Sequence, residues 1–256
     1  MLVIRAEQME RFKKTALSSF EDEMVAHLAE FSPPLYKAVG EEQMRKVVQL
    51  GRSQAAQYGF TYRGPVRLYL ELMLLFGSHF DTDPQYPWAA EILINQESGT
   101  QMQRAERLYE KTMDYRKNVA GPGDAYTLDA LKKIAVFAKH PLTITADDFI
   151  PAMQREIAQI YPQKAAYVGS AGLEALIRKG MGGALRQQFT TVHGMTLVTL
   201  LMFLLGHGCG ADPIYSWIRK ILNNTVTSTP ELKAQALKTE IIVWIEFIIS
   251  TNEGTA

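Results

Sequence analysis

One short segment carries the residue types that metal or nucleophile chemistry would use. His207, Cys209 and Asp212 lie within six consecutive residues. A zinc site needs three or four convergent ligands, and zinc deaminases pair His-x-Glu with a distant Pro-Cys-x-x-Cys, which this sequence lacks. Asp212 stands directly before Pro213, a pairing typical of a helix start. We therefore predict no metal site in this segment and expect Cys209 to be a partly buried thiol.

The other candidates for catalysis are scattered along the chain. The remaining histidines share no motif; they are His27, His79, His140 and His193. The P-loop, the nucleophile elbow and the dinucleotide-binding fingerprint are all absent from the sequence. We predict no catalytic residues and no cofactor, and hence a protein that is not an enzyme.

The dominant pattern in the chain is a repeat. Residues 73–95 return 129 positions later as residues 202–224, and ten of the 23 aligned positions are identical. The identical pairs include Gly77 and Gly206, Asp83 and Asp212, Pro84 and Pro213, Tyr86 and Tyr215, and Trp88 and Trp217. Self-similarity over this length predicts two copies of one structural unit.

The repeat divides the chain into two parts. We expect a first helical repeat at residues 1–125 and a second at residues 126–256, which begins with a connecting helix at 127–140. The string Gly121-Pro122-Gly123 is the clearest break between them, because glycine and proline interrupt regular structure. Whether the two repeats share a core is left open by the sequence.

The two repeats differ in length. Near their starts the offset becomes 140, because Leu2 aligns with Leu142 and Ile4 with Ile144. About 11 residues of the first repeat therefore have no counterpart in the second. We place this difference at residues 30–43, where Ser32-Pro33-Pro34 has the composition of a tolerant loop.

Apolar residues recur three and four positions apart along most of the chain, which is the period of an amphipathic helix. In the first predicted helix, residues 6–30, they form one stripe of Met9, Phe12, Ala16, Phe20, Met24 and Leu28. Further helices are expected at 41–58, 66–76, 84–94, 100–118, 127–140, 145–160, 173–188, 195–205, 213–223 and 230–250. Only the Leu-x-Ile starts at 2–4 and 142–144 could form strands, and such short strands add little stability. The predicted fold class is all-α.

Composition argues against several classes of protein. The 256 residues carry a net charge of zero, whereas broad nucleic-acid binding needs a basic face. The longest apolar run, residues 195–205, is about half the roughly 20 residues that span a bilayer, so no membrane insertion is expected. Arg5 and Glu7 stand where an export signal would have its apolar run. With a single cysteine and no export signal, we expect a cytoplasmic protein.

The repeated Asp-Pro-x-Tyr-x-Trp string has two interpretations. In the first, Asp and Pro start a helix and the aromatic residues lock it to the apolar helix before it. In the second, Tyr86, Trp88, Tyr215 and Trp217 form a paired surface that binds a partner, because Tyr and Trp often anchor interfaces. These four are the candidate partner-binding residues.

The first repeat resembles a known family in three strings. They are Leu2-Val3-Ile4-Arg5-Ala6-Glu7-Gln8-Met9, Phe20-Glu21-Asp22-Glu23-Met24-Val25 and Asp81-x-Asp83-Pro84-x-x-Pro87-Trp88. They are similar to a family of uncharacterised all-helical bacterial proteins encoded beside type VI secretion spike and toxin genes. The similarity covers roughly residues 1–115, and the second repeat has Ser216 in place of Pro87. The resemblance implies a protein partner from such a locus and supplies no catalytic residues.

These observations favour a protein that binds another protein, either a toxic effector or a secretion spike component. An adaptor or chaperone would hold an effector and load it, whereas an immunity protein would block a toxin. Immunity proteins more often carry a strongly charged surface, so the neutral composition favours the adaptor. Two alternatives remain: a helical enzyme or small-ligand binder in which His193 and His207 converge between the halves, and a subunit that oligomerises through residues 241–249.

Overall fold

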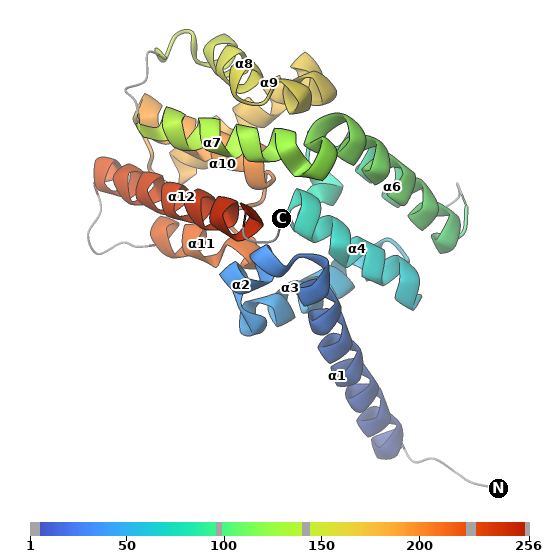
Figure 1. The fold of residues 1–256 in the computed structure, drawn as a ribbon. Coiled ribbons are helices and arrows are strands. Elements are labelled where there is room, and N and C mark those ends of the chain that lie inside the picture. Colours follow the sequence, from blue (N-terminus) through green and yellow to red (C-terminus); the bar gives the residue numbers. More distant parts are fainter. Residues whose placement is uncertain (1–5, 96–98, 140–143, 224–228, 254–256) are drawn as a thin grey trace, which may run out of the picture.

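The computed structural model describes residues 6–95, 99–139, 144–223 and 229–253 (Figure 1). Every regular element in these ranges is a helix, which confirms the predicted all-α class. The two Leu-x-Ile starts fall largely outside the described residues, so the possible strand pair is not tested. None of the described helices combines the length and the apolar content needed to cross a bilayer.

The first half of the chain folds into the following elements. They are α1 (Ala6–Phe31), α2 (Pro33–Val39), α3 (Glu41–Gln57), α4 (Arg63–Phe76), η1 (Phe80–Thr82), α5 (Pro87–Ile94), α6 (Gln101–Tyr115), the π-turn η3 (Arg116–Ala120), η4 (Pro122–Asp124) and α7 (Ala125–Lys139). The local sequence explains where several of these helices begin or end. Thr100 and Gln103 form a reciprocal capping box at the start of α6, and Gly77 ends α4.

The second half of the chain has fewer elements. They are α8 (Phe149–Ile160), α9 (Pro162–Arg186), α10 (Val192–Leu205), η5 (Pro213–Tyr215), α11 (Ser216–Leu222) and α12 (Pro230–Glu253). Helix α9 is interrupted at Gly169, where φ is +74°. The predicted helix at 173–188 is therefore only the second segment of a longer element.

Backbone geometry recurs at an offset of 129 residues. Gly40 and Gly169 have φ/ψ of 80°/159° and 74°/165°, and Gly77 and Gly206 have 90°/153° and 93°/151°. Even Gln188 adopts a positive φ, 65°, at the position that matches Gly59. Helix α2 thus corresponds to the first segment of α9. Duplication of the whole unit stays a prediction, but this part of the chain follows one backbone pattern twice.

The predicted position of the length difference is wrong. Residues 30–43 contain α2 and Gly40, which both have counterparts in the second half. The difference lies in the first helix, because α1 has 26 residues and α8 has 12. Pro33 and Pro34 suggested a loop, but proline at the first helical positions starts a helix as well as ending the one before it.

The halves share one core. Buried side chains from both halves form one continuous hydrophobic cluster. Within each half the first helix packs on the next long helix and that one on the apolar helix, as α1, α3 and α4 and again as α8, α9 and α10. Between the halves, α12 packs on α2 while η3 packs on α9. The connecting helix α7, predicted at 127–140, lies along α12 (Figure 1).

Candidate functional site

Two loops, residues 77–83 and 206–212, meet where the halves join and exchange equivalent hydrogen bonds; we call them the crossed loops. The Asp83 carboxylate accepts from the backbone N–H of His207, with a distance of 2.6 Å to Oδ2. The Asp212 carboxylate accepts from the backbone N–H of Ser78 at 2.7 Å. Ser78 and His207 occupy matching positions, one residue after the glycines that end α4 and α10. The contact is therefore reciprocal, as in a twofold interface between identical surfaces.

Each aspartate also holds its own turn. Asp83 Oδ1 accepts from the N–H of Gln85, and Asp212 Oδ1 from the N–H of Ile214, both at 2.9 Å. In the first half the predicted helix at 84–94 instead begins at Pro87, because residues 83–86 form a turn. The repeated Asp-Pro pair is thus explained by turn formation and by contact between the halves.

The glycines before these loops allow the two backbones to touch. A Cβ atom added to Gly77 would lie 2.4 Å from the carbonyl oxygen of Leu205, and one added to Gly206 would lie 2.6 Å from that of Phe76. Both distances are shorter than any allowed contact, and both glycines have positive φ. The repeat of glycine at these positions therefore follows from close packing of the halves.

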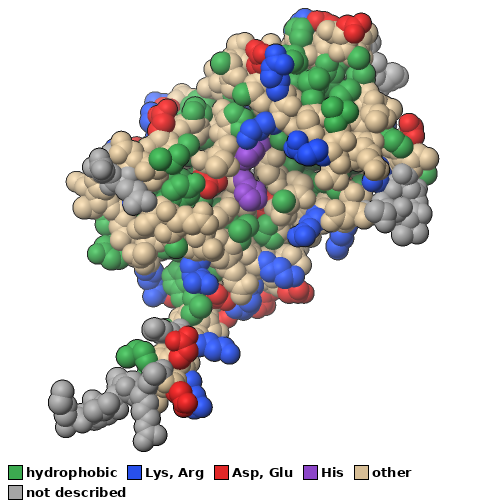
Figure 2. Space-filling model, turned by 180° about the vertical axis from the view of Figure 1, so that it is seen from behind, with side chains coloured by type: hydrophobic (Ala, Val, Ile, Leu, Met, Phe, Trp, Pro, Cys, Tyr) green, Lys and Arg blue, Asp and Glu red, His purple; other side chains and the backbone are tan. Residues whose placement is uncertain are grey.

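Two histidines lie beside the crossed loops. The ring centroids of His79 and His207 are 6.4 Å apart, and Figure 2 shows a pair of adjacent histidines near lysine and arginine side chains. His207 Nδ1 lies 3.1 Å from Lys179 Nζ, and its Nε2 lies 3.1 Å from Thr82 Oγ1. Burial lowers the pKa of His207, and Asp83 opposes that shift. The ring is therefore neutral and hydrogen-bonded at neutral pH.

His207 and Cys209 differ in their surroundings, and the absence of a metal site there stays a prediction. Cys209 was expected to be partly buried, but it lies buried in the core, and burial raises the pKa of its thiol well above the ordinary value, so it is protonated at neutral pH. In the described ranges no group of three or more His, Cys, Asp and Glu side chains could hold a metal ion. His193 has Lys238 as its charged neighbour and does not converge with His207.

The four candidate partner-binding aromatics do not form the expected surface. Tyr86 and Tyr215 are 1% and 5% exposed, Trp88 is also buried, and Trp217 is half-buried. The Tyr86 ring packs on Phe76 with a centroid distance of 4.6 Å. These side chains therefore serve the structural role, since they lock the helix after each loop to the core.

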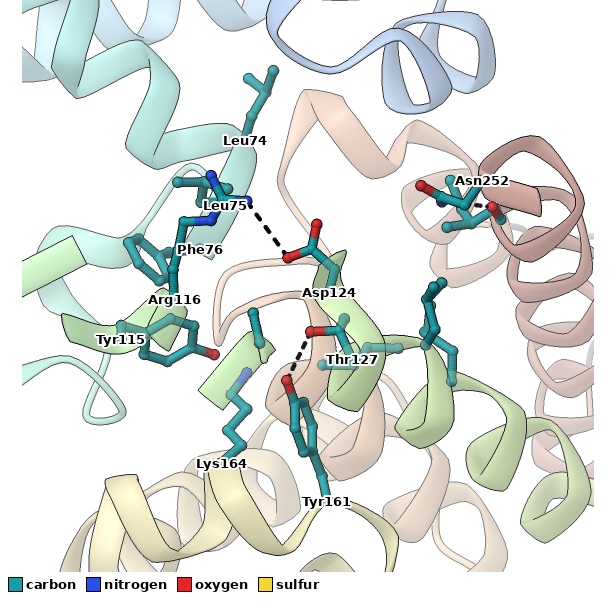
Figure 3. Close-up of a pocket in the computed structure, with 15 residues that line it drawn as sticks. Leu74, Leu75, Phe76, Tyr115, Arg116, Asp124, Thr127, Tyr161, Lys164 and Asn252 are labelled. Carbon is teal, nitrogen blue, oxygen red and sulfur yellow. Dashed lines mark hydrogen bonds and ion pairs between the residues drawn. The ribbon is translucent and has the colours of Figure 1, made fainter. Parts of the chain in front are cut away.

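A cavity of about 220 Å³ lies beside this junction (Figure 3). Its wall includes Lys164 of α9, whose Nζ donates to the carbonyl oxygen of Phe203 at 2.5 Å. Lys164 is 3% exposed, and burial lowers its pKa to about 8. The Tyr161 hydroxyl lies 2.8 Å from Thr127 Oγ1. Leu74, Leu128, Leu131, Leu204 and Ile248 supply apolar surface.

Sequence reasoning missed Lys164. A lysine in an amphipathic helix is ordinarily solvated, so its type and spacing gave no reason to single it out. One signal was present: with the offset of 129, Lys164 matches Leu35, which is buried in the first half. A lysine at a position that the other repeat keeps apolar is a candidate buried charge.

The apolar stripe of α1 divides into a covered and an uncovered part. Met24 and Leu28 are buried in the core and Phe20 is half-buried. Met9 and Phe12 are 43% and 62% exposed. Figure 1 shows why: the first turns of α1 project beyond the other helices.

Comparison with known proteins gives no match: no family model, no curated protein and no solved structure aligns with this chain.

Proposed function

We propose that the protein is a non-enzymatic accessory that binds another protein through the uncovered stripe of α1. The stripe consists of Met9, Phe12 and Ala16, which lie on one face of the helix. The exposure of Met9 and Phe12 carries the proposal. Burial of apolar side chains on a helix face stabilises the complex with the partner that covers them, and such faces are common binding elements.

The shape of α1 supports a protein as the partner. The spacing of three and four residues between Met9, Phe12 and Ala16 is that of a seam packed against another helix or in a groove. The corresponding helix α8 is 12 residues long and has no such extension. The extension is therefore an addition to the packed body, and the core does not need it for burial.

The resemblance to proteins of type VI secretion loci suggests the kind of partner. We infer an effector or a spike component, and a cytoplasmic adaptor or chaperone role. The net charge of zero supports an adaptor better than an immunity protein, which more often presents a strongly charged surface. Survival of cells that express the candidate toxin separates the two roles, because an immunity protein rescues them.

The test is co-expression with the proteins encoded by the genes that flank its own. Wild type is expected to co-purify with one of them in a fixed ratio, and Phe12→Glu to bind it about tenfold or more weakly, because a charge in an apolar interface is strongly disfavoured. Ser18→Glu is the matched control, since Ser18 is exposed on the opposite face of α1. Equal binding by Phe12→Glu and wild type would sink the proposal. A homodimer would also contradict the proposal if light scattering showed that Phe12→Glu dissociates it. The stripe would then be covered by a second copy of the chain.

A further inference from the structure

Lys164 is a buried cation with few partners. An ammonium group has three N–H donors. Across the described residues Lys164 makes one hydrogen bond, to the Phe203 carbonyl oxygen, and forms no ion pair. The rings of Phe203 and Tyr86 lie 4.8 and 5.7 Å from its Nζ and partly compensate the charge. A buried charge is costly unless it is paired, so this amine has unused capacity for an anion.

The amine borders a cavity that has room for an anion. Figure 3 shows the Lys164 side chain rising from α9 with its nitrogen between Tyr115 and Tyr161. The cavity of about 220 Å³ is lined by apolar side chains over most of its wall. An engineered cavity of about 150 Å³ in another protein binds benzene. The space therefore suits one aromatic ring or a short aliphatic chain together with a small polar group.

The charges around the cavity limit the ligand to one negative charge. Arg116 and Asp124 lie 3.7 Å apart and are both about half-exposed, so they form a balanced pair at the mouth. Lys164 is then the single cation without an ion-pair partner among the described residues of the wall; the buried Asp83 carboxylate favours its charged form without forming an ion pair with it. A dianion such as phosphate would bring a second charge that nothing there neutralises, and it would oppose Asp124.

We propose that this cavity binds a small monocarboxylate, with its carboxylate on Lys164 Nζ and its apolar part among the leucines. Tyr161 and Thr127 are already bonded to each other and shape the polar end of the space. The proposal is independent of partner binding by α1. The site forms only when the halves are packed together, because its wall combines α4 with α9 and α10.

Calorimetry and thermal shift with benzoate and hexanoate test the proposal on the full chain. Binding is expected within concentrations up to about 10 mM, which covers millimolar affinities. The neutral probes benzamide and hexanamide are expected to bind about 10- to 100-fold more weakly, because they lack the charge-assisted hydrogen bond. Lys164→Met should lose the carboxylate preference while Lys220→Met, an exposed lysine on α11, keeps it.

A second measurement needs no variant. Benzoate affinity of the wild type should fall about tenfold between pH 7 and pH 9, because the amine loses its proton above about pH 8. Binding that is independent of pH overturns the proposal. Equal binding of acid and amide, unchanged carboxylate binding by Lys164→Met, and no binding of any probe each overturn it as well.

Discussion

At the scale of residues, the two aspartates of the repeat do more than start a turn. Each is buried and accepts one N–H from its own turn and one from the opposite half. Burial raises the pKa of Asp212, and hydrogen bonds from Ser78 and Ile214 oppose that shift. These bonds satisfy backbone groups that water cannot reach.

Removing one of these carboxylates should therefore be costly. Asp212→Ala leaves the N–H groups of Ser78 and Ile214 without an acceptor, and we expect a loss of about 2–4 kcal/mol in the free energy of unfolding. Asp83→Ala should cost a similar amount, and the double variant less than the sum, because both act on one contact. Urea denaturation measures this, with the exposed Asp129→Ala as the control. A loss at Asp212 no larger than at Asp129 would contradict the account.

The buried Lys164 predicts how the stability of the protein depends on pH. The pKa of Lys164 is about 8 in the folded protein, and its ordinary value, taken for the unfolded chain, is 10.5. Between these two pH values the unfolded chain binds more protons than the folded protein. Stability due to this residue therefore rises as pH increases through that window. The free energy of unfolding of the wild type, relative to that of Lys164→Met, should increase by roughly 2 kcal/mol between pH 7.5 and 9.5. Denaturation of both proteins at the two pH values measures it; a difference that stays constant or shrinks would show that Lys164 is not a buried cation.

At the scale of elements, the sequence predicted the apolar helices well. The predicted helices at 66–76 and 195–205 correspond to α4 and α10, which end at the predicted residues Phe76 and Leu205, each followed by a glycine. Prediction failed where proline has two meanings: Pro33 starts α2, and the helix expected at 84–94 begins at Pro87. Periodicity gave the stripe of α1 correctly. It could not show which residues of the stripe are buried against the other helices and which are exposed.

At the scale of the whole molecule, the repeat predicted related halves but not how they meet. The bond between Asp83 and His207 joins residues 124 positions apart, and nothing in either local string indicates that pairing. The cavity at Lys164 likewise depends on the packing of both halves. What could be predicted was the set of residues that recur, and most of them turned out to lie at the crossed loops or in the core beside them.

The protein is a packed body from which the first turns of α1 project uncovered. Hydrogen exchange by mass spectrometry, on the free protein and on its complex with the flanking-gene partner, tests this most directly. We predict slow exchange at residues 77–83 and 206–212 in both states, and fast exchange at residues 7–19 that becomes slow only in the complex. Protection by the partner elsewhere on the body, with residues 7–19 unchanged, would contradict the account.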